Sequence, residues 1–364
     1  MEKFRKYAFC LLVLANVLAI IGLLLVGNAD LLRPEEWPKL SNAGLLMPAA
    51  IAVNVAFLVL WALLKPRRLW LPVVGLLAGF VPIRQYTPFN RSEEVPHGAI
   101  KVLSWNVAMF EGYDESQGRR SEMMKYLLRS RADIICLQEA TDKKGSHPPF
   151  AILRREYPYT AYIPKKLPSG NGLFVASRYP ILSQDTIPYH SSSNLSAEFV
   201  LDINGYKVSL ISNHLQSYGL SIKEREEFHQ MVKGSVVGDT AYIETHDLIQ
   251  KLGKATAIRA AQARMVAGRV QRRLRENMPV IVVGDFNDTP ISYTRRTLSK
   301  DLIDCYIASG NGPGTSFNRN GIYARIDHIL CSDFFKPYGA KVDSGIKTSD
   351  HYPIYCWLEI RPKP

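Results

Sequence analysis

The sequence predicts an α/β domain that follows a group of membrane-spanning helices. Most of the long apolar runs lie in the first 83 residues, whereas the rest of the chain alternates between apolar and polar residues like a soluble domain. In this second part, short apolar runs typical of strands recur with helical stretches between them. Asn204-Gly205 separates two alternating runs and is a strong hairpin signal, so we expect those two strands to be antiparallel neighbours.

Residues 1–83 are predicted to be a membrane anchor with two or three transmembrane helices. Residues 8–26 are apolar except for Asn16 and are long enough to cross a hydrocarbon core of roughly 30 Å. A cleaved signal peptide is the alternative for this segment. Residues 45–64 form a second predicted span. Residues 69–83 are short and contain two prolines and two glycines, so they are either a third span or a re-entrant segment.

The distribution of positive charge predicts which side of the membrane the rest of the chain occupies. Lys3, Arg5 and Lys6 precede the first span, and residues 65–68 add Lys65, Arg67 and Arg68 after the second. Because cytoplasmic loops are enriched in Lys and Arg, both groups are placed in the cytoplasm. We therefore expect a multi-pass protein of the cytoplasmic membrane. With three spans, the following domain is extracytoplasmic; with two, it faces the cytoplasm.

The remaining chain is divided into a polar linker, residues 84–98, and a soluble domain, residues 99–364. The whole chain has a net charge of +12. Only 10 of its 45 Lys and Arg and 6 of its 33 Asp and Glu precede residue 99, which leaves +8 for the domain. This charge suits a polyanionic substrate or an anionic membrane surface. The alternative is that it has no such role, because many membrane-attached proteins are basic. The five cysteines have no metal-ligand spacing and favour buried free thiols over disulfides.

Strands and helices alternate along the soluble domain. Strands are predicted at 100–105, 133–138, 172–177, 198–203, 206–212, 279–284, 326–331 and 352–359, and helices at 121–131, 222–232 and 241–276. The last helix carries eight basic residues, Lys251, Lys254, Arg259, Arg264, Arg269, Arg272, Arg273 and Arg275. We interpret them as a solvated outer face, with docking to anionic lipid headgroups as the alternative.

Polar side chains capable of acid–base and metal chemistry occur next to four of these strands. They lie in Ser104-Trp105-Asn106, Leu137-Gln138-Glu139, Gly284-Asp285-Phe286-Asn287 and Ser349-Asp350-His351. Asp285 and Asn287 are two residues apart, so on an extended chain they point the same way. Hydrolysis of a phosphate ester requires an activated water, stabilised phosphate oxygens and help for the leaving oxygen. Alone, each segment is equally compatible with a strand cap or a solvent-exposed strand end.

In this order, the four segments resemble the endonuclease/exonuclease/phosphatase superfamily, the DNase I-like metal-dependent phosphoesterases, over roughly residues 100–358. The resemblance implies an α/β (α+β) fold, a four-layer sandwich of two mixed β-sheets flanked by helices, with the site at one end. It also implies Mg²⁺, or alternatively Mn²⁺, as cofactor. By the same resemblance Glu139 is the metal-binding glutamate, Asn106 helps to hold metal and phosphate, and Asp350 is a metal ligand or supports one.

The resemblance also assigns catalytic roles. Asp285 orients or deprotonates the attacking water, and Asn287 binds a phosphate oxygen. Asp327 pairs with His351, which either accepts the proton of the water or, as imidazolium, stabilises the phosphate. His214 binds phosphate. The chain departs from the family pattern at Asn213, where Thr is usual, and at His328, where Tyr is common, and neither change removes an assigned group.

The function expected from these residues is that of a membrane-tethered, divalent-metal-dependent phosphohydrolase. A phosphodiesterase acting on phospholipid headgroups or other small phosphoesters by in-line attack of water is favoured. The first alternative is a nuclease acting on DNA or RNA. A non-catalytic domain that binds phosphorylated ligands at the membrane is an alternative from another class. An enzyme is favoured over it because each expected position holds a chemically competent residue.

Overall fold

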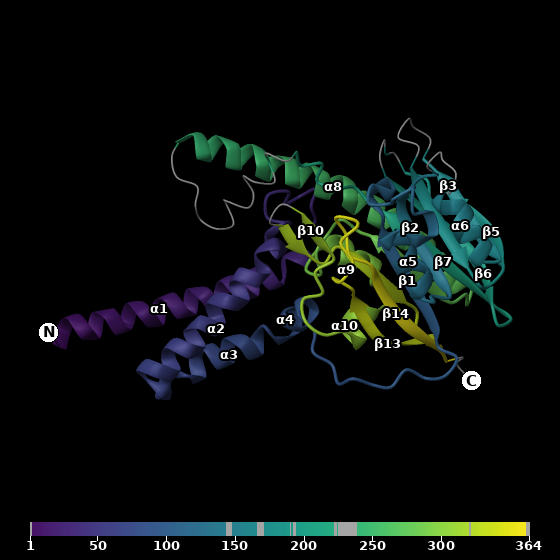
Figure 1. Cartoon of the computed structure of the whole chain (residues 1–364). Helices are drawn as coiled ribbons and strands as arrows, with labels where there is room; N and C mark the ends of the chain where they lie inside the picture. Colours follow the sequence, from purple (N-terminus) through teal and green to yellow (C-terminus); the bar gives the residue numbers. More distant parts are fainter. Residues whose placement is uncertain are drawn as a thin grey trace.

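The computed structural model describes residues 2–142, 148–165, 171–189, 191, 194–221, 224, 239–319 and 322–361. The helix predicted at 222–232 lies outside these residues, apart from Glu224. Within the described chain, the strands of the C-terminal domain form two six-stranded mixed sheets and a short hairpin (Figure 1). The predicted α/β sandwich is therefore confirmed.

The first sheet has the order β13-β14-β1-β2-β4-β3, and the second has the order β5-β6-β7-β8-β12-β9. The strands of the first are β13 (Phe335–Val342), β14 (Ile354–Ile360), β1 (Ile100–Asn106), β2 (Ile134–Ala140), β4 (Gly172–Ser177) and β3 (Tyr159–Pro164). Those of the second are β5 (Ile181–Thr186), β6 (Leu195–Ile203), β7 (Tyr206–His214), β8 (Val280–Asp285), β12 (Asp327–Cys331) and β9 (Ile303–Asp304). The hairpin consists of β10 (Phe317–Arg319) and β11 (Ile322–Ala324). A parallel pair lies at the centre of each sheet, β1 with β2 and β7 with β8.

Burial of apolar side chains explains the layers. The largest cluster lies between the sheets and includes Val102, Cys136, Phe199 and Ile281, all fully buried. Helices α5 (Glu122–Arg129) and α6 (Pro149–Glu156) cover the outer face of the first sheet. Helices α8 (Asp239–Arg275) and α9 (Tyr293–Leu298) cover that of the second. A short helix, α10 (Cys305–Ser309), packs beside β13. The five cysteines, all in described residues, are free thiols, and four are buried.

The N-terminal region consists of α1 (Glu2–Gly27), α2 (Met47–Leu64), α3 (Trp70–Ala78) and α4 (Phe80–Tyr86). Among the described residues, α1 and α2 are long and apolar enough to cross a membrane. Helices α3 and α4 meet at a 62° bend and form either a broken span or a re-entrant segment. Asn16 joins α1 to α2, because its Oδ1 accepts a hydrogen bond of 2.9 Å from the indole of Trp61.

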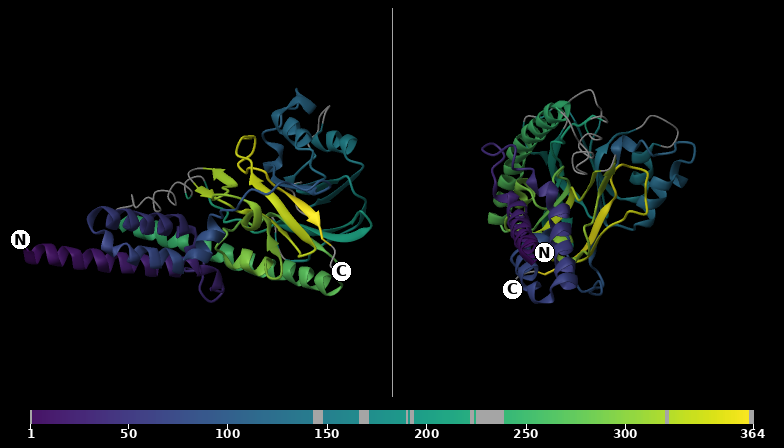
Figure 2. Two further views of the ribbon diagram at one scale, coloured as in Figure 1. Left: turned by 90° about the horizontal axis from the view of Figure 1, so that it is seen from below. Right: turned by 90° about the vertical axis from the view of Figure 1, so that its left-hand side faces the viewer.

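These helices are docked on the C-terminal domain (Figures 1 and 2). Arg325, fully buried, donates to the carbonyls of Gln85 and Tyr86 at the end of α4, at 2.7 and 3.3 Å. Asn90, in the segment predicted as a linker, donates to the carbonyls of Ile307 and Gly310. Helix α4 continues to Tyr86, so the predicted linker 84–98 begins as helix and then packs against the domain.

The basic residues of α8 match the predicted solvated face only in part. Lys254, Arg264, Arg272 and Arg275 are exposed. Five of the eight form ion pairs within the described residues: Lys251 with Glu224, Arg259 with Asp288, Arg264 with Glu35, Arg269 with Asp185 and Glu198, and Arg273 with Glu198 and Glu276. Their acidic partners are far away in the sequence, apart from Glu276. These ion pairs therefore hold α8 against the second sheet and against the N-terminal region.

Glu198 is the buried centre of this network and should make stability depend on pH. Burial alone raises the pKa of a carboxyl group, but hydrogen bonds from Arg273, Ser209 and Arg269 hold the pKa of Glu198 at about 2, below its ordinary 4.5. The stabilisation is therefore present above pH 4.5 and is lost as the pH falls toward 2. Removing one partner of a buried ion pair costs about 3–5 kcal/mol. We expect Glu198→Gln to lower the thermal midpoint at neutral pH, and this difference from wild type should shrink on acidification.

Candidate active site

Strand pairing brings the predicted site residues together at one end of the sandwich. In the second sheet, His214 at the end of β7 is opposite Asp285 at the end of β8, and Asp327 at the start of β12 is opposite the same Asp285. In the first sheet, Asn106 ends β1 opposite Gln138, the residue before Glu139. Because these strand ends of the two sheets lie at the same end of the sandwich, groups far apart in the sequence converge there.

Asp285 is the central residue of the site. Its Oδ2 accepts a hydrogen bond of 3.0 Å from Asn106 Nδ2, and it lies 3.9 Å from His214 Nε2 and 3.7 Å from His351 Nε2. Its Oδ1 accepts a hydrogen bond of 2.8 Å from the backbone N–H of Asn287. Burial and the nearby Asp327 carboxylate raise the pKa of Asp285, whereas the two histidines lower it. The first two effects are larger, and the pKa is about 6. A carboxyl group with this pKa exchanges protons readily near neutral pH.

The local backbone explains the Gly-Asp-Phe-Asn sequence. Gly284 has a φ of +127°, and a Cβ atom there would lie 2.1 Å from the carbonyl oxygen of Asn213 on the neighbouring strand. Only glycine fits this close approach. Asn287 has a φ of +53°, a left-handed conformation that asparagine tolerates, and its amide donates to Leu215 O and Asp285 Oδ2. The turn thus holds Asn287 beside Asp285.

Asp327 and His351 form a buried pair. The Oδ2 of Asp327 lies 2.8 Å from His351 Nδ1, which leaves Nε2 directed at Asp285. Burial lowers the pKa of His351, but the Asp327 and Asp285 carboxylates outweigh it and raise the pKa to about 10. Trp105 holds the backbone of His351, because its indole donates to the His351 carbonyl at 2.8 Å. The imidazole is therefore held in one orientation and carries a positive charge at neutral pH.

Glu139 enters the site through a backbone irregularity. The pairing of β2 with β4 shifts between Leu137 and Ala140, and Glu139 has a φ of +50°. This bulge turns the carboxylate toward His214, whose Nε2 lies 3.3 Å from Oε1. Asn106 Nδ2 donates to Glu139 at 3.1 Å as well as to Asp285, while its Oδ1 accepts from the backbone N–H of Ala108. This geometry favours Asn106 as a bridge between the two carboxylates over the predicted role of oxygen ligand.

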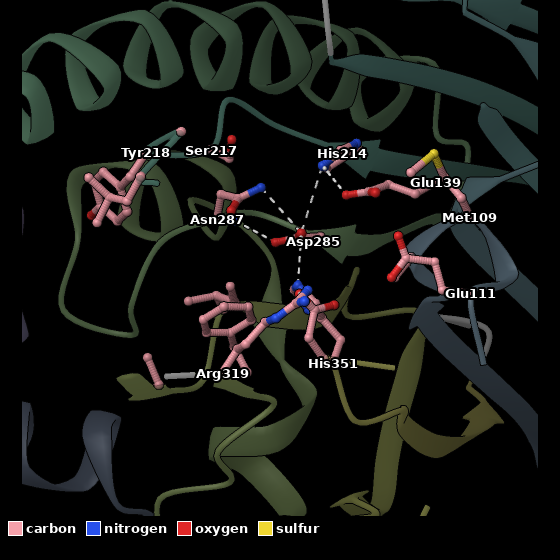
Figure 3. Close-up of a pocket in the computed structure, with 17 residues that line it drawn as sticks. Met109, Glu111, Glu139, His214, Ser217, Tyr218, Asp285, Asn287, Arg319 and His351 are labelled. Carbon is pink, nitrogen blue, oxygen red and sulfur yellow. Dashed lines mark hydrogen bonds and ion pairs between the residues drawn. The ribbon is translucent and has the colours of Figure 1, made fainter. Parts of the chain in front are cut away.

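Six of the eight predicted residues line one cavity of about 250 Å³: Glu139, His214, Asp285, Asn287, Asp350 and His351 (Figure 3). The other two, Asn106 and Asp327, are buried behind its wall and hold Asp285 and His351. Asp350 lies 3.2 Å from Arg319 Nη1, an ion pair that the sequence analysis missed. Glu111, Tyr218 and Arg319 also line the cavity and were not predicted. None of the three belongs to a recognisable motif, so the sequence contains no signal for them.

The cavity fits a hard divalent cation. Four carboxylates, Glu111, Glu139, Asp285 and Asp350, line this one space. Like charges this close repel one another unless a cation or protons offset them, and carboxylate oxygens are the ligands that Mg²⁺ and Mn²⁺ prefer. Asp285, Asp327 and His351 additionally bring ligand atoms within 4.8 Å of one another. Both carboxylate oxygens of Asp285 already accept hydrogen bonds, from Asn287 and Asn106, so Glu139 is the better candidate to hold the ion, with Asp350 on the same cavity as a ligand or its support.

Comparisons with known proteins agree with this geometry. A family model described as the endonuclease/exonuclease/phosphatase family matches residues 103–351, and one described as a domain of unknown function matches residues 9–86. No curated protein matches the chain in sequence.

Three solved structures illustrate the shared fold. The human Nocturnin catalytic domain with bound sulfate anion has 16% identity and a TM-score of 0.54, covering 74% of this chain and 97% of its own. Truncated Caenorhabditis elegans TDP2 has 16% identity and a TM-score of 0.50, covering 73% and 99%. An endonuclease/exonuclease/phosphatase from Beutenbergia cavernae DSM 12333 has 19% identity and a TM-score of 0.50, covering 72% and 71%. The predicted DNase I-like sandwich is confirmed.

Proposed function

Because the chain belongs to the endonuclease/exonuclease/phosphatase family, we propose that it is a membrane-anchored phosphodiesterase that cleaves phospholipid headgroups or other small phosphoesters. The family fold is a hydrolase fold for which divalent-metal dependence is typical. The observation that carries the proposal is the convergence on Asp285 of Asn106, His214 and His351 beside one cavity. Asn106, His214 and Asp285 end three different strands and His351 lies just before β14; His214, Asp285 and His351 line the cavity that we assign to the phosphate.

In the proposed reaction, a water oxygen bonds to phosphorus in line with the ester oxygen that leaves. Asp285 accepts the proton of the water, for which its raised pKa of about 6 is suited. His351, charged at neutral pH, stabilises the negative charge on a non-bridging oxygen or protonates the leaving oxygen. Its raised pKa argues against the alternative role as general base. The products are a phosphomonoester and an alcohol.

Two further groups line the cavity. His214 lies between Glu139 and Asp285, and we assign it to binding of a phosphate oxygen. Asn287 donates its amide N–H bonds to Leu215 O and Asp285 Oδ2, so in this arrangement it positions Asp285 rather than a phosphate oxygen. A divalent cation held by Glu139, with Asp350 as a further ligand or its support, would supply Lewis-acid stabilisation of the phosphate oxygens. Asn106 donates to both Glu139 and Asp285 and so links the residue that would hold the ion to the residue that accepts the proton.

A panel of phosphoesters tests this proposal with the full-length protein in detergent. We expect release of alcohol from bis(p-nitrophenyl) phosphate and from phosphatidylglycerol, and loss of both activities in Asp285→Asn. The second candidate, a nuclease, is favoured by the net charge of +8 on residues 99–364. Cleavage of single-stranded DNA or RNA with a kcat/KM above that for both other substrates would replace the proposed activity by this one.

Two groups of contacts support an extracytoplasmic site. The basic residues Lys3, Lys6, Lys65 and Arg68 line one cavity, so the N-terminus and the α2–α3 turn lie at the same end of the helices. At the other end, Asp30 pairs with Arg296 of the C-terminal domain. Since basic residues mark the cytoplasmic side, this arrangement favours three crossings.

We therefore expect a reporter fused after Arg91, at the end of the full-length anchor, to lie outside the cytoplasm. A matched fusion after Arg68 should have the opposite location. A cytoplasmic signal at both positions contradicts three crossings and leaves the catalytic proposal unaffected.

A further inference from the structure

The segment between the first two helices forms part of the support of the catalytic cavity. We call residues 28–46 the anchor loop. Its Asn42 Oδ1 accepts hydrogen bonds from Tyr218 Oη at 2.9 Å and from Thr256 Oγ1 at 2.8 Å. Tyr218 lines the cavity, and its ring also lies against the guanidinium of Arg259, 4.3 Å from the ring centroid. The cavity wall is thus fixed from one side by α8 and from the other by the anchor loop.

Only a few residues separate this wall from the predicted bilayer. Leu45 and Tyr218 both pack against the buried cluster of Leu220, Leu248 and Leu252, and Tyr218 and Leu220 line the cavity. Helix α2 begins at Met47, two residues after Leu45. Gly44 allows the anchor loop to lie close against Ile291 of the C-terminal domain, because a Cβ atom at this position would lie 2.0 Å from the Ile291 carbonyl oxygen. The cavity is therefore attached directly to the end of a membrane-spanning helix, and its distance from the bilayer is fixed rather than set by a flexible tether.

The anchor loop presents an apolar surface at this level. Leu31, Trp37, Leu40 and Leu46 are each between 46% and 55% exposed. These side chains lie at the ends of the apolar helices α1 and α2. An exposed tryptophan and leucines beside a span are typical of the membrane–water interface, so the bilayer is what this apolar surface contacts. Figures 1 and 2 show the helices extending from one side of the domain, with β5 and β6 on the far side.

We infer that the anchor loop rests in the bilayer interface and holds the cavity over the membrane, so that the substrate is a lipid phosphodiester of that same membrane. This inference rests on the proposed function and selects the lipid among its substrates. In the reaction a water oxygen bonds to the lipid phosphorus, one P–O ester bond breaks, and the leaving alkoxide is protonated. The products are a phosphomonoester and an alcohol.

The experiment compares lipid in the same membrane with lipid in another. Full-length protein is reconstituted in phosphatidylcholine vesicles that contain labelled phosphatidylglycerol, or in unlabelled vesicles mixed with protein-free vesicles that carry the label. Soluble bis(p-nitrophenyl) phosphate is assayed in both. We expect lipid cleavage to be faster by roughly 10²-fold in the first arrangement, as for two sites confined together, and the soluble rate to be equal in both.

Each other outcome overturns the inference in a distinguishable way. Equal lipid cleavage in both arrangements means that the cavity is not held at its own membrane. Cleavage of the soluble diester without cleavage of either lipid rejects the lipid substrate and leaves the proposed function in place. Cleavage of nothing rejects both together.

Two glycine variants test the role of the anchor loop itself. Gly44→Ala should push the loop away from Ile291, whereas Gly22→Ala in α1 meets no atom within 4 Å and is the matched control. We expect Gly44→Ala to lower the ratio of lipid cleavage in its own membrane to cleavage of the soluble diester by roughly 10-fold or more, against the confinement advantage of about 10²-fold. Asn42→Ala should act in the same direction. An equal fall in both rates, or no fall in either variant, contradicts the inference.

Discussion

Removal of divalent metal from the full-length protein should abolish phosphodiester hydrolysis, and Mg²⁺ or Mn²⁺ should restore it. The physical reason is the crowding of Glu111, Glu139, Asp285 and Asp350 around one cavity of about 250 Å³. A phosphodiester carries one negative charge, and these carboxylates repel it unless a cation offsets their charge. The measurement is the rate of hydrolysis after exhaustive chelation and during titration with each metal. Full activity without metal contradicts the assignment.

Two matched variants show which carboxylates hold the ion. Glu139→Gln keeps the shape of the side chain but removes its charge, so the metal concentration for half-maximal activity should rise by at least roughly 10-fold. Asp350→Asn distinguishes the predicted ligand role from the ion pair with Arg319, 3.2 Å away. A similar rise identifies Asp350 as a ligand or its direct support. An unchanged metal requirement means that Asp350 serves in the ion pair with Arg319 and does not hold the metal. Binding of Mn²⁺ followed by electron paramagnetic resonance gives a readout that does not depend on turnover.

The sequence could predict the strand ends that carry chemistry, because each combines a buried apolar run with a polar residue next to it. Asp285 ends such a run and His351 directly precedes one, and Figure 3 shows their side chains beside each other. Edge strands were harder to predict. Most of β5 is exposed, so its residues lack the alternation that marks a half-buried strand. Strand β13 contains Pro337 and Gly339, which argue against a strand when only the sequence is read, and its pairing with β14 is irregular between Tyr338 and Lys341.

Other features depend on contacts between distant parts of the chain. The ion pairs of Arg264 with Glu35 and of Arg269 with Asp185 join segments that local patterns cannot relate. The same holds for Asn42, an ordinary loop residue in the sequence that contacts Tyr218 in the fold. The orientation of Asn106 is also a tertiary result, since it depends on two carboxylates from other strands. Local pattern therefore predicts which groups are available, and long-range packing decides what each one touches.

The Asp327–His351 pair is expected to act as one unit. General acid–base groups contribute about 10²–10⁴-fold, so His351→Ala should lower kcat/KM by that order. Asp327→Asn removes the charge that raises the pKa of His351 to about 10, so the buried imidazole should become largely neutral at pH 8. The double variant should then be hardly worse than His351→Ala alone, because residues that work together are strongly non-additive.

The pH profile of Asp327→Asn separates a functional pair from a structural one. A raised pKa keeps wild-type His351 charged until the pH approaches 10, whereas in Asp327→Asn the pKa should fall toward or below its ordinary 6.5. Lowering the pH from 8 to 6 should therefore restore part of the activity of this variant by recharging the ring, while Asp285, with a pKa of about 6, limits the recovery. His214 provides the comparison, since it approaches Asp285 from the other side (Figure 3). Its removal should multiply with Asp327→Asn. If the Asp327 and His351 effects also multiply, with circular dichroism confirming folded variants, the two residues act independently and the assignment of a pair is wrong.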